Sequence, residues 1–129
     1  MEEFREKTDQ ELTGAIIGAA INVHRGLGPG LLESCYEACM VHELHSQGIE
    51  FQRQTEIGVI YKDHPIDCGF RLDLLVENRV IVEIKAVEKL LPIHDAQLLT
   101  YLKLTGKRIG LLVNFNVEVL KDGIRRRVL

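Results

Sequence analysis

The stretch LDLLVENRVIVEIKAV, residues 72–87, consists of two aliphatic segments joined by a short polar one. The second segment, residues 80–87, has the composition of a buried strand, and alternate residues of a strand point to opposite faces. One face is aliphatic throughout, with Val80, Val82, Ile84 and Ala86. The other face carries the opposite charges of Glu83 and Lys85. These charges indicate either a solvated face or a pocket whose chemistry needs them.

The turn between the two segments sets which residues face each other. If residues 77–79 form the turn, Val76 pairs with Val80, and Asp73 then lies directly opposite Glu83. The Cβ atoms of such a pair are about 5 Å apart. A two-residue turn would shift the pairing by one position, so the juxtaposition of the two carboxylates depends on the turn.

Two carboxylates that face each other should destabilise the sheet. A bound divalent cation would reverse the sign of their interaction, because Mg²⁺ and Mn²⁺ prefer hard oxygen ligands. Lys85 on the same face could then orient a water or stabilise an anionic transition state. The alternative is that Asp73, Glu83 and Lys85 form surface ion pairs on an exposed face. Leu75 and Ile81 share that face, which indicates that it is partly covered.

Periodicity along the rest of the chain predicts an α/β fold. Apolar spacing and turn residues predict three helices, over residues 11–24, 31–46 and 94–105. They also predict strands over 51–61, 66–76, 80–87 and 109–115, and a short last strand after Gly123. The order αα-βββ-α-β(β) indicates helices packed on a mixed sheet. We expect one domain over residues 1–129.

Composition indicates a cytoplasmic protein. The chain is 46% hydrophobic and 27% charged, and no run approaches the roughly 20 apolar residues of a membrane span. The beginning, MEEFREKTDQ, is too polar for a signal peptide. The three cysteines form neither a disulfide framework nor a CxxC site, and we expect them to be packing residues in a reducing compartment.

Charge by itself weighs against a general nucleic-acid coat protein, which would be basic, because the net charge is −3. Its distribution softens this point, since basic residues gather near the end of the chain. These are Lys103, Lys107, Arg108, Lys121, Arg125, Arg126 and Arg127.

Three motifs together carry a resemblance to a known family. Asp73, followed ten residues later by Glu83–Ile84–Lys85, resembles the D-x(n)-[D/E]-x-K signature of the PD-(D/E)XK nuclease superfamily. GLLESCY, residues 30–36, resembles the G-x-x-E-x-x-Y motif of the GxxExxY family within it. QLLTY, residues 97–101, is similar to the Q-x-x-x-Y motif of RecB-type exonucleases. The resemblance covers about residues 8–128.

The resemblance implies a restriction-endonuclease-like αβββαβ core and a divalent-metal site that hydrolyses phosphodiesters. The implied catalytic residues are Asp73, Glu83, Lys85, Gln97 and Tyr101. The implied ligands of Mg²⁺ or Mn²⁺ are Asp73, Glu83, the Ile84 carbonyl and, directly or through water, Glu33. Lys85 would activate or position the attacking water, and Gln97 and Tyr101 would orient Lys85 or a phosphate. The proline of the PD element is replaced by Leu72. The four-cysteine iron–sulfur cluster of some RecB-type relatives is not expected in a chain with three cysteines.

Several alternatives stay open. Glu33 would be at the third position of its helix if Gly30 were the N-cap, where a carboxylate favours the helix dipole. Gln97 and Tyr101 could be half-buried polar residues of an amphipathic helix. The leading hypothesis is a metal-dependent nuclease acting on nucleic acid, DNA rather than RNA. Its rivals are a catalytically weak or inactive nucleic-acid-binding or assembly module on the same fold, and a homodimer that completes the DNA groove across a two-fold axis.

Overall fold

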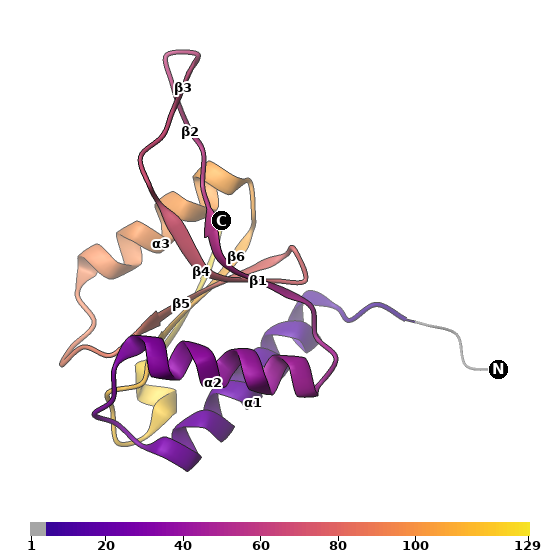
Figure 1. Cartoon of the computed structure of the whole chain (residues 1–129), viewed down its shortest axis with the longest axis vertical. Coiled ribbons are helices and arrows are strands. Elements are labelled where there is room, and N and C mark those ends of the chain that lie inside the picture. The colour runs from indigo at the N-terminus through magenta and orange to yellow at the C-terminus, as the bar shows by residue number, and fades with distance from the viewer. Residues whose placement is uncertain (1–4) are drawn as a thin grey trace.

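The computed structural model describes residues 5–129, and its elements follow the predicted order of helices and strands (Figure 1). The helices are α1 (Asp9–Leu27), α2 (Glu33–Ser46) and α3 (Pro92–Thr105), with a 3₁₀ turn η1 (Leu120–Gly123). The strands are β1 (Phe51–Glu56), β2 (Val59–Tyr61), β3 (His64–Ile66), β4 (Arg71–Val76), β5 (Val80–Lys85), β6 (Ile109–Asn114) and β7 (Ile124–Val128).

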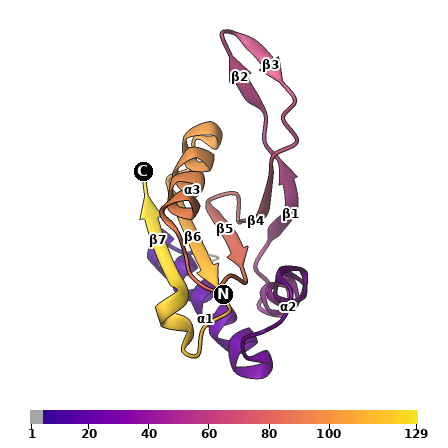
Figure 2. The same cartoon turned by 90° about the vertical axis from the view of Figure 1, so that its left-hand side faces the viewer.

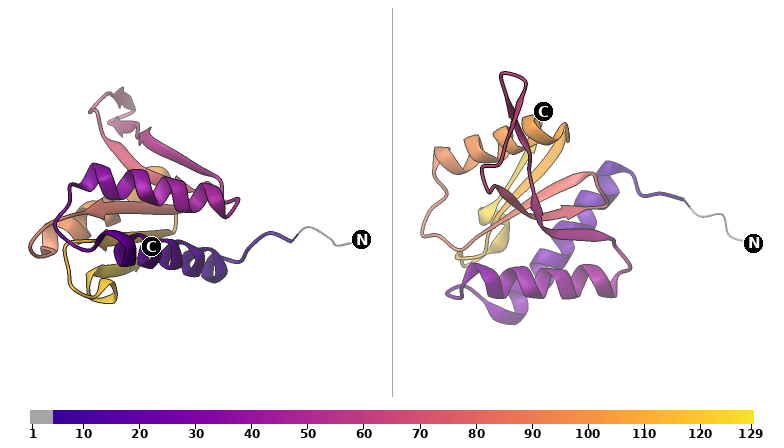
Figure 3. Two further views of the ribbon diagram at one scale, coloured as in Figure 1. Left: turned by 60° about the horizontal axis from the view of Figure 1, so that its bottom comes forward. Right: turned by 45° about the horizontal axis from the view of Figure 1, so that its top comes forward.

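Five strands form a mixed sheet in the order β1-β4-β5-β6-β7. Only β5 and β6 are parallel neighbours, and α3 is the crossover that parallel strands require. Helices α1 and α2 lie side by side on one face, and α3 covers the other (Figures 2 and 3). The expectation of an α/β fold with a mixed central sheet flanked by helices is confirmed.

The two faces of the sheet bury two separate apolar clusters. The α1–α2 side contains the aliphatic face of β5 with its neighbours, including Leu74, Val76, Val80, Val82, Ile84, Leu111 and Val113. The α3 side contains Ile57, Leu72, Leu75, Ile81, Leu98, Tyr101, Leu102 and Leu112. The central strands β4, β5 and β6 are therefore buried on both faces, whereas the edge strands β1 and β7 are largely exposed.

The turn between β4 and β5 has the length that puts Val76 opposite Val80. The Arg79 N–H donates to the Val76 carbonyl at 2.9 Å. Glu77 and Asn78 between them have φ angles of 51° and 55°. Positive φ at both central residues is the type I′ feature whose twist suits a hairpin. The predicted register is confirmed.

Two predicted strands are wrong in their extent, because each is interrupted. Residues 51–61 divide into β1 and β2. Residues 66–76 divide into the last residue of β3, which begins earlier at His64, a connection over 67–70, and β4. Strands β2 and β3 pair only with each other and form a hairpin that projects from the body (Figure 1). Apolar residues continue through this hairpin, so periodicity gave no sign of the interruption. Its side chains are exposed instead, with Ile60 74% and Tyr61 63% accessible.

Within residues 5–129, no helix has both the length and the apolar character needed to cross a membrane. The cysteines are free, and only Cys39 is partly buried. Cys35 and Cys68 are exposed, so the packing role expected for them is wrong. Cys35 lies on the outer side of α2, and Cys68 lies in the connection between β3 and β4.

Candidate active site

The candidate site lies where β4 and β5 separate. Their backbone pairing runs from Val76–Val80 to Leu74–Val82 and goes no further. Beyond it, the Ile84 N–H donates to Asp73 Oδ2 at 2.7 Å rather than to a strand carbonyl. The backbone N–H of Asp73 approaches Glu83 Oε1 at 3.4 Å. The separating strands therefore bring the two carboxyl groups together at the predicted position.

Burial and mutual repulsion dominate the electrostatics of this pair. Glu83 is 4% exposed. Burial, followed by the charge of Asp73, raises the pKa of Glu83 to about 9. Burial also raises the pKa of Asp73, although the Ile84 N–H opposes the shift. Lys85 favours the ionised form of both, yet no cationic side chain of residues 5–129 forms an ion pair with either. The pair without a metal therefore keeps a proton at neutral pH.

A cavity of about 210 Å³ opens beside Asp73, between α2 and the sheet. It is lined by Glu33, Ser34, Glu37, Gln54, Asp73 and Ile84. A larger cavity of about 600 Å³ lies elsewhere, between the end of α2 and the β4–β5 turn, and has no buried ionisable group in its lining. We therefore place the chemistry at the smaller cavity, because its lining includes Asp73 of the carboxyl pair.

Glu33 reaches this cavity from the start of α2. Its Oε1 accepts the Ala86 N–H at 3.3 Å, directly after β5. The proposed capping alternative is wrong, because the N-cap is Leu32 and not Gly30, which makes Glu33 the first helical residue. Gly30 instead has a φ of 99°, within the turn that precedes α2.

Tyr36, the last residue of the G-x-x-E-x-x-Y motif, has a structural role. Its ring is buried and stacks on Phe115 with centroids 4.5 Å apart. Its hydroxyl donates to the Gly28 carbonyl at 2.6 Å and accepts the Leu31 N–H at 3.1 Å. Tyr36 thus holds the turn that delivers Glu33 to the cavity.

Lys85 ends β5 and is half-buried, next to Asn114 of the parallel strand β6. Asn114 is buried and binds both backbone groups of Val87, at 3.0 and 2.9 Å. This contact fixes the chain just after Lys85. Asn114 was not predicted, since its position beside Lys85 follows only from the β5–β6 register.

Tyr101 and Gln97 occupy successive turns of α3. Tyr101 is 6% exposed. Burial, followed by the charges of Glu83 and Asp73, raises its pKa, so its phenol lies within electrostatic reach of the pair. Gln97 is half-buried one turn earlier, and its amide has no hydrogen-bond partner among residues 5–129. Among residues 5–129, neither the Tyr101 phenol nor the Gln97 amide forms a hydrogen bond with the carboxyl pair, and Tyr101 is the more deeply buried of the two.

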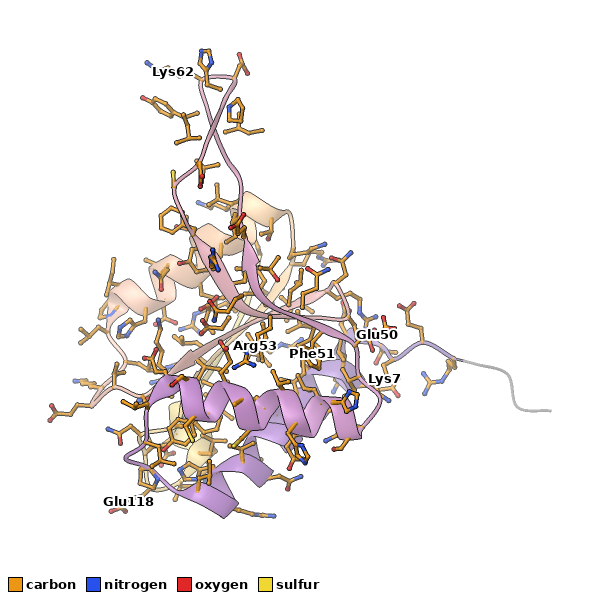
Figure 4. All side chains as sticks on the ribbon, viewed as in Figure 1. Lys7, Glu50, Phe51, Arg53, Lys62 and Glu118 are labelled. Carbon is orange, nitrogen blue, oxygen red and sulfur yellow. The ribbon has the colours of Figure 1, made fainter. Side chains whose placement is uncertain are left out.

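Two further polar residues that line the cavity, Glu37 and Gln54, were not predicted as site residues. Glu37 is buried on α2 and accepts from Arg53 Nε at 2.7 Å and from Gln54 Nε2 at 2.6 Å. Figure 4 shows Arg53 on β1, above α2. The i, i+4 spacing from Glu33 was the available signal for Glu37, since it puts both on one helix face.

The donor set suits a hard divalent cation. Within residues 5–129, no three His, Cys, Asp or Glu side chains are grouped so that they could hold a metal. Mg²⁺, however, commonly takes one or two protein carboxylates and keeps several waters. Asp73 and Glu83 supply two such carboxylates, and a dication would replace the proton that burial, followed by mutual repulsion, favours on Glu83. The residues present therefore fit Mg²⁺ or Mn²⁺.

Comparison with known proteins agrees with this chemistry. Residues 10–127 match the family model described as the PD-(D/E)XK nuclease superfamily. No curated protein matches significantly. No solved structure does so either. The matched segment includes all three layers and every residue of the candidate site, from Glu33 to Tyr101. The chain belongs to the PD-(D/E)XK nuclease superfamily, with the restriction-endonuclease-like arrangement of its elements.

Proposed function

We propose that the protein is a Mg²⁺- or Mn²⁺-dependent nuclease that hydrolyses phosphodiester bonds of nucleic acid. The observation that carries the proposal is the pair formed by half-buried Asp73 and buried Glu83, joined where β4 and β5 separate. A protein that used this face only for packing would gain stability from apolar residues there, because buried like charges are costly. Membership of a nuclease superfamily offers a function for the pair, namely binding of the catalytic metal.

Each side chain has a definite part in this proposal. Asp73 and Glu83 hold the metal, and the Ile84 carbonyl and Glu33 complete its surroundings directly or through water. The metal, when bound, stabilises the negative charge that develops on the transferred phosphoryl oxygens. Lys85 orients the attacking water and adds a positive charge beside the phosphate.

The phenol of Tyr101, buried on α3, is proposed to donate a hydrogen bond to a phosphate oxygen or to orient Lys85. Gln97, on the next turn of the same helix, is proposed to contact the phosphate from farther out.

The finer assignments rest on particular residues. Gly30, Glu33 and Tyr36 support membership of the GxxExxY branch, since each serves the turn and helix that deliver a carboxylate to the cavity. We propose DNA as the substrate and the cytoplasm as the location, the latter because the cysteines are free. We also propose that residues 1–129 form a single domain, which acts as a monomer or as a homodimer.

Cleavage assays test it directly. The purified protein is incubated with single-stranded DNA, duplex DNA and RNA in Mg²⁺ or Mn²⁺, with EDTA as the blank. We expect metal-dependent cleavage that Asp73→Asn and Lys85→Ala reduce by 100-fold or more. Asp122→Asn and Lys103→Ala are the matched controls, because both residues are exposed. Cleavage that persists unchanged in the two site variants would refute the catalytic assignment.

A binding or assembly module with little turnover is the second candidate. It is favoured by the absence, within residues 5–129, of a third metal-binding side chain grouped with the pair. Calorimetric titration separates the candidates. Binding of neither Mg²⁺ nor Mn²⁺ at millimolar concentration would support the module and contradict the nuclease.

A further inference from the structure

Gln54 in β1 has a backbone conformation that is unusual for its residue type. Its φ is 53°, in the left-handed region, although its neighbours Arg53 and Thr55 pair normally with Leu74 and Leu72 of β4. A non-glycine residue is strained in this region and persists there only where its surroundings impose it. The position opposite Gln54 in this register is Asp73.

The unusual backbone changes the direction of the Gln54 side chain. In a regular strand, successive side chains point to opposite faces. Here Arg53 and Gln54 both reach one carboxylate, that of Glu37 on α2, at 2.7 and 2.6 Å. Glu37 is 7% exposed and therefore a fixed anchor. The positive φ allows Gln54 to face the cavity instead of turning away from it.

From this anchor the same amide reaches Asp73. Gln54 Nε2 lies 3.5 Å from Asp73 Oδ1, while the Ile84 N–H donates to Oδ2. An amide nitrogen has two hydrogens, one for each carboxylate. Asp73 is thus contacted at both oxygens, which restrains rotation of its carboxylate plane.

The Gln54 amide is an uncharged donor, which suits a partner of Asp73 if Asp73 is to bind a metal. Arg53 offsets the charge of Glu37, which otherwise disfavours ionisation of Asp73. Gln54 then restrains Asp73 without cancelling its charge, so that the charge stays available to a dication. A lysine in its place would compete with the metal.

We propose that Gln54 is a positioning residue that orients the Asp73 carboxylate for the metal, with Glu37 as its anchor. This inference rests on the proposed function of the Asp73–Glu83 pair. Partners of metal ligands typically contribute 10–100-fold to metal affinity or activity. Gln54 acts through Asp73 and does not itself hold the metal.

The test is Mn²⁺ binding by calorimetry, with thermal unfolding in EDTA measured on the same proteins. In Gln54→Gly we expect the Kd for Mn²⁺ to rise at least tenfold while the Tm stays the same or rises, because glycine adopts positive φ readily. Gln52→Gly is the matched control on the same strand. It should lower the Tm and leave the Kd unchanged, since Gln52 pairs with Leu75 and contacts neither carboxylate.

Two more variants test the chain of contacts. Gln54→Lys should weaken Mn²⁺ binding at least as much as Gln54→Gly, because its ammonium group competes for Asp73. Adding Glu37→Gln to Gln54→Gly should cost no further affinity, because residues that act through one another are not additive. In the cleavage reaction of Gln54→Gly, the Mn²⁺ concentration that gives half the maximal rate should rise by a large factor. The rate at saturating Mn²⁺ should fall by a smaller factor.

The outcomes separate this inference from the proposed function. Wild-type protein that binds no Mn²⁺ would overturn the metal site and the role of Gln54 together. Wild-type binding that Asp73→Asn abolishes and Gln54→Gly leaves intact would overturn the role of Gln54 alone. If the losses of Mn²⁺ affinity caused by Glu37→Gln and Gln54→Gly were fully additive, the role of Gln54 would also be overturned. Glu37 would then act on the metal site independently of Gln54.

Discussion

Replacing Glu83 by glutamine removes an ionisable group from the interior and keeps its shape. The pKa of Glu83 is about 9 in the fold and 4.5 in its ordinary range, so between these values the wild-type chain takes up a proton when it folds. Because the folded state binds more protons than the unfolded state, stability falls as pH rises from 4.5 towards 9. At about 1.4 kcal/mol per pH unit, this cost is about 3 kcal/mol at pH 7.

Urea unfolding in EDTA at pH 5, 7 and 8.5 measures the effect. Glu83→Gln should be more stable than wild type by about 3 kcal/mol at pH 7 and by less than about 1 kcal/mol at pH 5. Added Mn²⁺ should stabilise wild type and not the variant, because a ligand of the folded state alone shifts the equilibrium. Glu118→Gln, at an exposed position, should change neither quantity. A variant that is no more stable than wild type at pH 8.5 would refute the reasoning.

Two other substitutions test how the fold supports the site, each by chemical denaturation. Tyr36→Phe removes two backbone hydrogen bonds and keeps the ring, so we expect a loss of about 1–2 kcal/mol, whereas Tyr61→Phe on the exposed hairpin should have no effect. An equal effect at both tyrosines would contradict the buried contacts. Gly123→Ala places a methyl group against the backbone oxygen of Asn114 and should cost about 3 kcal/mol or prevent folding. Gly14→Ala, with open space in α1, should stabilise by about 0.5–1 kcal/mol, and a neutral Gly123→Ala would contradict the close packing.

The carboxyl pair could be located from sequence because local signals determined its register. The turn at residues 77–79 and the alternation of apolar residues along 80–87 together placed Asp73 beside Glu83. The separation of the strands at this point could not be predicted, because alternation continues through it. That separation frees the Ile84 N–H to bind the Asp73 carboxylate.

Residues of the surrounding network were missed for a different reason. Gln54 and Asn114 meet the site only after distant segments pack, and no local pattern marks them. Glu37 had one local signal, its i, i+4 spacing from Glu33, which was not used. The β2–β3 hairpin was missed because its apolar residues resemble those of a sheet strand while lying exposed. The position of Glu33 in α2 was misjudged because the helix begins at that residue, after an extended Leu32.

The central claim is that Asp73 and Glu83 together hold a divalent metal. A crystal grown or soaked in Mn²⁺ and measured for anomalous scattering tests it most directly. The account predicts an anomalous peak between the two carboxylates, at about 2.1 Å from an oxygen of each. A well-ordered crystal in millimolar Mn²⁺ with no peak there, and with the two carboxyl groups still in contact, would contradict it.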